Sequence, residues 1–111
     1  MGTQMNYFEV VKNILQEYAD FFSKNSPYPL RALFDDIRQS YLLLDSNWHG
    51  QTYIHNTPVH IDIINEKIWI QYDDTEEGIA TDLLEAGVPA QDIVLGFRPP
   101  ELRPYTEFAA A

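Results

Sequence analysis

VHIDIINEKIWIQYDDTEEGIATDLLEAGVPAQDIVLGF, residues 59–97, is the stretch that decides the fold. It contains, without interruption, the pattern of a β-hairpin, an acidic helix start, a helix stop and a short apolar strand. It holds no nucleophile paired with a base, no phosphate-binding loop and no recognisable metal-ligand spacing. This stretch therefore predicts a fold without predicting a chemistry.

The hairpin is predicted from residues 59–64 and 67–72, which alternate apolar and polar side chains and are rich in β-branched residues. Asn65 and Glu66 form the two-residue turn between them, where asparagine tolerates left-handed backbone. Because side chains alternate between the faces of a strand, the register decides which apolar residues share a face. Depending on the register, Ile61 and Ile63 should share one face of the hairpin either with Ile68 and Ile70 or with Trp69.

A second helix is predicted near residues 75–86. Asp74 is interpreted as its N-cap, with Glu77 at the third position and further carboxylates near the positive end of the helix dipole. Gly87 predicts a left-handed helix stop, and the proline two positions later is common after such a cap. Residues 93–97 are then expected to form a short strand.

An amphipathic helix is predicted over residues 6–23, where apolar residues recur every three or four positions. Asn6 can cap this helix, and Glu9 can complete a capping box by reaching back to it. The prolines that follow lack a backbone N–H and favour extended geometry before them, so the helix should end by Asn25.

Further strands are predicted at residues 30–35 and 40–47, and residues 49–57 are expected to form an irregular or bulged strand. The apolar run that begins at Tyr41 is short and lies between turn signals, which favours strand over helix. Together these elements predict a single α+β domain over residues 1–111. In it, an antiparallel sheet of about four strands packs with the two helices.

The composition limits the kinds of function. The 111-residue chain has 17 acidic and 7 basic residues, and its formal net charge of −10 opposes direct binding to a nucleic-acid backbone. The absence of cysteine excludes disulfides and thiolate zinc sites. Because no stretch is apolar enough for a signal peptide or long enough to span a bilayer, we expect a cytoplasmic protein that does not bind membranes.

The strongest electrostatic feature is a run of seven carboxylates between positions 68 and 97, with no lysine or arginine among them. One interpretation is a docking surface for a basic partner; the other is helix capping plus a solvated helix face. Trp48, surrounded by polar residues, is the better surface candidate of the two tryptophans, and such aromatic anchors often dominate interfaces. The candidate partner-binding residues are Trp48, Asp73, Asp74, Glu76, Glu77, Asp82 and Glu85.

The residue types of catalytic and metal sites occur without the spacing of such sites. His49, His55 and His60 lie six and five positions apart, unlike the close pairs that ligate zinc, although Asp62 could join them across strands. Residues 73–77 lack the alternating ligands and central glycine of a calcium loop. His60 and Asp62 share a strand face, but no hydroxyl or thiol nucleophile is marked by its context. We therefore expect no catalytic, metal or cofactor site, and histidines held by a single carbonyl or carboxylate.

Six separated blocks of the chain carry a family resemblance. They are WHG at 48–50, VHIDI at 59–63, KIWIQYD at 67–73, TEEGIA at 75–80, GVPAQDIVLGF at 87–97 and YTEFA at 105–109. In this order and at unbroken spacing, they resemble the XisI family of cyanobacterial excision-controlling proteins. Separated blocks in order are far more specific than a single short motif, and the resemblance covers residues 7–108.

The resemblance implies an α+β fold and a role in controlling removal of the fdxN element, a DNA insertion excised during heterocyst differentiation. Members of the family occur beside XisH, a protein of nuclease-like fold, so an XisH-like partner is implied. The resemblance carries no catalytic or ligand-binding residue onto this chain.

Charge and resemblance together lead to the hypothesis of a non-enzymatic regulatory protein that acts by contact with an XisH-like partner. One alternative is direct DNA binding as a recombination directionality factor. It would need a local basic stripe, for which the chain has four arginines, Arg31, Arg38, Arg98 and Arg103. An acidic, antitoxin-like neutraliser of a neighbouring nuclease is a second alternative. The exposed edge of a small antiparallel sheet also predicts a homodimer or higher oligomer.

Overall fold

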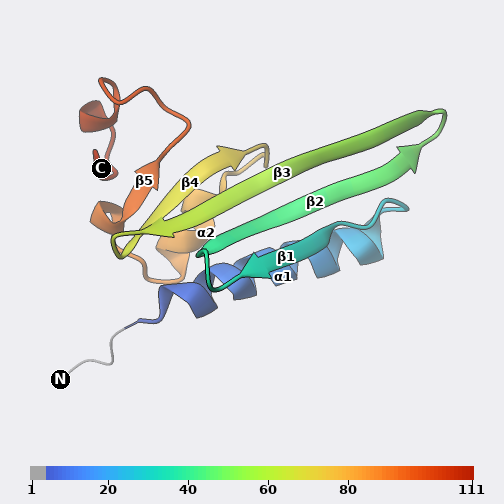
Figure 1. Cartoon of the computed structure of the whole chain (residues 1–111), viewed down its shortest axis with the longest axis horizontal. Coiled ribbons are helices and arrows are strands. Elements are labelled where there is room, and N and C mark those ends of the chain that lie inside the picture. Colours follow the sequence, from blue (N-terminus) through green and yellow to red (C-terminus); the bar gives the residue numbers. More distant parts are fainter. Residues whose placement is uncertain (1–4) are drawn as a thin grey trace.

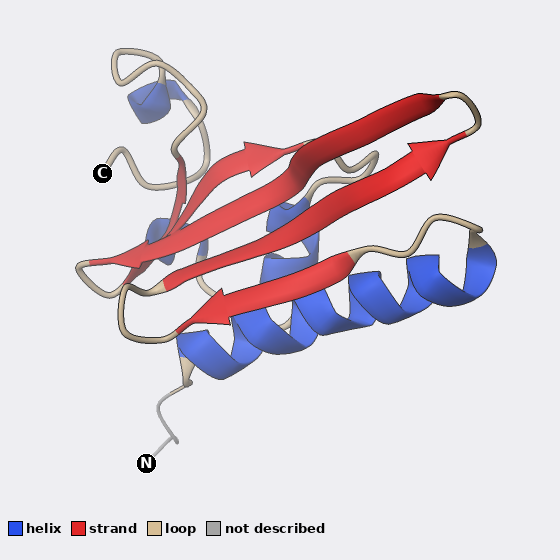
Figure 2. Ribbon diagram, turned by 45° about the vertical axis from the view of Figure 1, so that its right-hand side comes forward, coloured by secondary structure: helices blue, strands red, loops and turns tan. Residues whose placement is uncertain are grey.

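Two helices and a five-stranded sheet make up the fold, as described by a computed structural model for residues 5–111. The elements are α1 (Tyr7–Asn25), β1 (Arg31–Asp35), β2 (Ser40–His49), β3 (Thr52–Ile64), β4 (Lys67–Asp73), α2 (Ile79–Glu85), η1 (Ala90–Asp92), β5 (Ile93–Leu95) and η2 (Arg103–Tyr105). The strands are ordered β1-β2-β3-β4-β5, and both helices cover the same face of the sheet (Figures 1 and 2). The predicted α+β class is confirmed. None of the helices within residues 5–111 is long and apolar enough to cross a membrane.

The sheet has five strands rather than about four, and it is mixed rather than purely antiparallel. β5 lies parallel to β4, with Ile93 beside Ile68 and Leu95 beside Ile70. A parallel neighbour requires a crossover connection, and α2 supplies it. β5 ends at Leu95, two residues earlier than the predicted end at position 97. The Gly96 N–H still donates to the Ile70 carbonyl at 2.8 Å, and the chain then leaves the sheet.

The N-terminal helix begins and ends close to the predicted positions. The Asn6 side chain caps α1 by accepting a hydrogen bond from the Glu9 N–H at 3.2 Å. The Glu9 carboxylate does not complete the predicted capping box; it lies 3.4 Å from the Lys12 ammonium. The helix continues to Asn25 and stops before the prolines, as expected.

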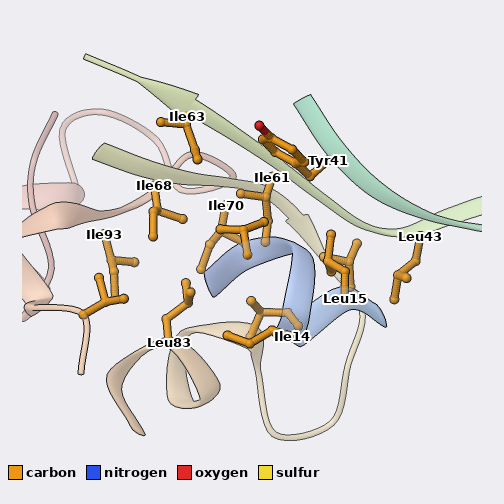
Figure 3. Packing of buried hydrophobic residues seen from close by; sticks show 14 of the residues in the cluster. Ile14, Leu15, Tyr41, Leu43, Ile61, Ile63, Ile68, Ile70, Leu83 and Ile93 are labelled. Carbon is orange, nitrogen blue, oxygen red and sulfur yellow. The ribbon is translucent and has the colours of Figure 1, made fainter. Parts of the chain in front are cut away.

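Four isoleucines of the β3–β4 hairpin form the centre of the core. Ile61 pairs with Ile70, Ile63 pairs with Ile68, and all four are buried beneath the helices (Figure 3). Trp69 therefore points to the opposite face of the sheet. Each fully buried isoleucine contributes about 1.5–3 kcal/mol of transfer free energy, so this register is strongly preferred over a one-residue slip.

The second helix starts later than predicted, and Asp74 does not cap it. α2 begins at Ile79, and the N-cap position is Gly78, whose φ of 87° is disfavoured for other residues. Asp73 provides the cap instead, because its carboxylate accepts the Ile79 N–H at 2.6 Å. Gly87, at a φ of 101°, ends the helix as predicted.

The longest feature of the sheet is a two-stranded ribbon, residues 45–56, formed by the ends of β2 and β3. It projects beyond β1 and β4 (Figure 1), in a molecule of 49 × 35 × 26 Å. The predicted irregular or bulged strand at residues 49–57 is confirmed only from Thr52, because residues 50 and 51 form the ribbon's turn, and residues 52–57 belong to the same strand as residues 59–64. The predicted bulge is present: the pairing shifts from Leu43–Val59 to Asp45–Asn56, which leaves one extra residue in β3 around Pro58.

The hairpin turn yields a stability prediction. Glu66 has a φ of 65° and Asn65 a φ of 51°, so both occupy the left-handed region that a type I′ turn requires. Glu66→Gly should raise the free energy of unfolding by about 1 kcal/mol, because glycine adopts this conformation without steric cost. Urea denaturation would measure the change. Glu66→Ala removes the same charge but keeps the strain, so an equal gain from alanine would contradict this explanation.

Candidate functional site

The acidic loop, residues 73–78, is organised around the Asp73 carboxylate. One carboxylate oxygen accepts the Thr75 N–H at 2.9 Å and the Thr75 hydroxyl at 2.6 Å, and the other accepts the Ile79 N–H. The Gly78 N–H donates to the Thr75 hydroxyl oxygen at 3.1 Å. The loop is therefore held by its own hydrogen bonds, and Asp73 has an internal structural role.

The acidic segment, residues 73–92, contains the seven carboxylates noted in the sequence, and they fall into two groups. Asp82 and Asp92 are half-buried and accept hydrogen bonds from tyrosines of α1: Tyr18 reaches Asp82 at 2.8 Å, and Tyr7 reaches Asp92. Like Asp73, they are engaged in hydrogen bonds within the protein. The other four remain exposed at the surface; they are Asp74, Glu76, Glu77 and Glu85.

The two tyrosine contacts change the ionisation of the phenols. Burial raises the pKa of the Tyr7 hydroxyl to about 12, and its hydrogen bond to Asp92 adds to the effect. Burial also raises the pKa of Tyr18, followed in importance by its hydrogen bond to Asp82. Both phenols therefore remain protonated donors at neutral pH, and they tie α1 to the acidic segment.

A groove of about 770 Å³ lies between the acidic loop, the C-terminal half of α1 and the base of the ribbon. Its apolar walls include the α1 side chains Phe21 and Phe22, whose rings meet edge to face at 5.6 Å. Tyr28 lines it from the connection to β1 and stacks on the His49 ring at 3.8 Å. Three exposed carboxylates of the loop border the groove, namely Asp74, Glu76 and Glu77.

The charged residues that line this groove are all acidic. No lysine or arginine in the described part of the chain belongs to its lining, and a fourth carboxylate, Asp45, lies deeper at the base of the ribbon. Asp45 accepts hydrogen bonds from Asn47 at 2.7 Å and shares a 3.3 Å contact with His49. The exposed loop carboxylates have no such side-chain partners among residues 5–111, so they are available to a cationic group.

Trp48 lies at the surface, as expected, but away from the groove. Its side chain is 65% exposed and packs on Tyr53 across the ribbon, with ring centroids 5.2 Å apart. Because side chains alternate along β2, Trp48 and the groove-lining His49 occupy opposite faces of the ribbon. Trp69, one of the two alternatives for the core face of the hairpin, lies instead on the helix-free face of the sheet beneath the Arg103 guanidinium.

The predicted partner-binding residues therefore occupy four places. Asp74, Glu76 and Glu77 border the groove, while Asp82 and Glu85 line a separate depression between α1 and α2. Trp48 belongs to the ribbon, and Asp73 is engaged inside the loop. The structure does not bring all seven together on one surface, and their partner-binding role stays a prediction.

Among the residues that the structure describes, each histidine has one side-chain hydrogen-bond partner. His49 contacts Asp45, His55 contacts Ser46, and His60 lies 2.9 Å from Asp62. Asp62 also accepts hydrogen bonds from Ser40 at 2.6 Å and Gln71 at 3.2 Å. Ser40 thus donates to the carboxylate and not to the imidazole, which is not the hydrogen-bond order of a serine nucleophile activated by histidine. Within residues 5–111, no three His, Asp or Glu side chains are grouped to hold a metal ion.

The apolar part of the groove was missed in the sequence. Phe21 lies two residues after Ala19, the last buried residue of α1, and its side chain is 59% exposed. A large aromatic residue outside the apolar stripe of a helix is a signal that could have drawn attention to it. Tyr28 gave no comparable signal, because a proline-rich connection does not reveal which side chains it turns inward.

Comparisons with known proteins agree on one family. A family model described as XisI protein matches residues 1–110. A solved structure of a XisI-like protein from Anabaena variabilis ATCC 29413 is 34% identical, with a TM-score of 0.87, and the match covers 95% of this chain and 96% of that one. The fdxN element excision controlling factor XisI from the same organism is 35% identical, with a TM-score of 0.78 and the same coverage. None of the curated proteins matches the chain.

The acidic loop gives a paired prediction for stability. Asp73→Ala removes the acceptor of three hydrogen bonds and should lower the free energy of unfolding by about 2 kcal/mol. Asp74→Ala, one position away, removes an exposed carboxylate and should change stability by less than about 0.5 kcal/mol. Thermal and urea denaturation of both variants would measure the difference. Equal losses would show that the loop is not organised by Asp73.

Proposed function

Because the chain belongs to the XisI family, we propose that it is a non-enzymatic regulatory protein that acts in DNA-excision control by binding a partner protein. The excision-control role is supported by the similarity to the fdxN element excision controlling factor of Anabaena variabilis. The proposed partner is an XisH-like protein, which the family resemblance implies.

The observation that carries the proposal of protein contact is the groove. It combines an apolar wall of Phe21, Phe22 and Tyr28 with a carboxylate border, and these are the two components of a typical interface: a desolvated anchor and a charged rim. A groove of this size accepts side chains of a peptide segment. The border carboxylates would then select among segments by charge.

The groove specifies the chemistry of the segment that it would bind. Apolar or aromatic side chains would cover Phe21 and Phe22, and lysine or arginine side chains would reach Glu76 and Glu77. The net charge of −10 would also attract such a segment from a distance. A basic, amphipathic segment of the XisH-like partner fits this description.

The position of the arginines favours protein contact over direct DNA binding. Arg31 and Arg38 lie at the β1 edge of the sheet, and Arg38 is paired with Asp35 at 3.2 Å. Arg98 and Arg103 lie beyond β5, at the opposite edge, over aromatic rings. Four arginines divided between two edges give no continuous positive stripe for a phosphate backbone.

Charge reversal in the groove tests the proposal. The double variant Glu76→Lys and Glu77→Lys should weaken binding of an XisH-like protein by about tenfold or more, since unfavourable contacts replace favourable ones. Phe21→Ala should weaken it as well, because the anchor surface is truncated. Isothermal titration calorimetry with purified proteins measures both effects.

The matched control reverses two exposed carboxylates outside the groove and outside the candidate binding residues, Glu17 and Glu101. This variant has the same net charge and should bind nearly as well as the wild type. Equal weakening by both pairs would assign the effect to total charge and remove the groove from the proposal. If no complex forms, and the chain instead retards excision-site DNA in a gel at low salt, the DNA-binding alternative would replace it.

A further inference from the structure

The ribbon leaves one strand edge without a neighbour. β4 pairs with β3 only from Val59 onward, and none of the strands within residues 5–111 lies beside residues 52–57 on the side away from β2. Main-chain donors and acceptors along such an edge are a template for another strand. In Figure 1 this part of β3 extends well past the end of β4.

The other edges of the sheet are protected. Asn47 donates to the Pro29 carbonyl at 2.9 Å and Tyr28 stacks on His49, so the connection before β1 covers the β2 side of the ribbon. β5 is three residues long, and the Ala109 N–H donates to the Ile93 carbonyl along its outer side at 2.9 Å. β1 has five residues with a charge at each end. The β3 edge lacks the short length, charges and cover that normally prevent edge pairing.

The same region is the longest uncharged stretch of the chain. Residues 46–61 contain no Asp, Glu, Lys or Arg, although the chain has 24 such residues in total, 17 acidic and 7 basic. Two copies with a net charge of −10 repel each other wherever their carboxylates meet. Along residues 46–57 they can approach without placing like charges together, because the ribbon's one carboxylate, Asp45, is buried, and a strongly basic partner would find no carboxylate on residues 52–57 to pair with.

We propose that a second copy of this chain pairs with the open β3 edge, residues 52–57, to form an antiparallel dimer about a twofold axis. Antiparallel pairing of a strand with its own copy is isologous, so the same six residues supply both sides of the interface. The two ribbons become one four-stranded sheet. The proposal concerns a different surface from the groove and does not depend on the partner proposed above.

The pleat restricts the register of this dimer. An axis perpendicular to the sheet brings like faces together, so Trp48 and Tyr53 of both copies lie on one common face. Residues directly opposite each other must then point to the same face, which places either Ile54 or His55 on the axis. A residue on the axis faces its own copy at a Cα separation of about 4.5–5.5 Å.

Cysteine cross-linking tests the register, because the natural chain has no cysteine to interfere. That Cα separation lies within the range of a disulfide. Under mild oxidation, either Ile54→Cys or His55→Cys should convert to a covalent dimer on non-reducing gels. Leu33→Cys, at the centre of the β1 edge, is the matched control and should remain monomeric on the gel. Cross-linking by Leu33→Cys alone, or by none of the three, would overturn the proposal.

Charge at the axis provides a second test. Sedimentation equilibrium of the wild type should give twice the 12.9 kDa chain mass. His55→Glu places one carboxylate of each copy in the interface, either on the axis or one residue from it, and should raise the dimer dissociation constant at least about tenfold, while Asn13→Glu adds the same charge on α1 and should leave it unchanged. Circular dichroism melts would establish that both variants fold. A monomeric wild type, or a His55→Glu dimer of unchanged affinity, would refute the inference.

Discussion

The tight turn at Asn65 and Glu66 sets the register between β3 and β4, and the remaining structure depends on that register. It turns Ile61, Ile63, Ile68 and Ile70 toward the helices, so that α1 and α2 cover one face of the sheet and leave the other open. It also directs Trp69 to the open face, where Arg103 of the C-terminal segment covers it. A shift by one residue would exchange the two faces and remove the surface on which both helices pack.

The same hairpin also determines where the surface features lie. Asp73 is the last residue of β4 and pairs with Val59, so the loop that follows starts from a fixed point of the sheet. The hydrogen bonds of Asp73 then hold the loop beside the C-terminal half of α1, where the groove forms. Because β4 has seven residues and β3 has thirteen, the rest of β3 continues alone with β2 as the ribbon. The difference in length between β3 and β4 thus separates the charged surface at the acidic loop from the uncharged surface of the ribbon.

Local patterns predicted most of the elements, since α1, the hairpin and the stop at Gly87 depend on residues close together in the sequence. The errors concern long-range geometry. Asp73 and Asp74 are equivalent in a pattern, and only the position of Gly78 decides which carboxylate reaches the first helical N–H. Residues 49–57 and 59–64 were predicted as two strands, but a bulge around Pro58 lets residues 52–64 form one long strand. The groove could not be predicted as a whole, because its walls come from segments that meet only in three dimensions. Its three border carboxylates were recognised, and its aromatic wall was not.

The bulge at Pro58 also divides the molecule into regions of unequal local stability. On the C-terminal side of the bulge, residues 59–64 of β3 pack against the core. On the other side, the ribbon residues 45–56 have few apolar contacts, and each of the two strands there is hydrogen-bonded to only one neighbouring strand. Segments of this kind open at a free-energy cost well below that of global unfolding, so their amide hydrogens exchange with solvent earlier than those of the core. The ribbon is therefore a subglobal unit of the fold, with an opening equilibrium of its own, and whatever pairs with its edge also shifts that equilibrium toward the closed state.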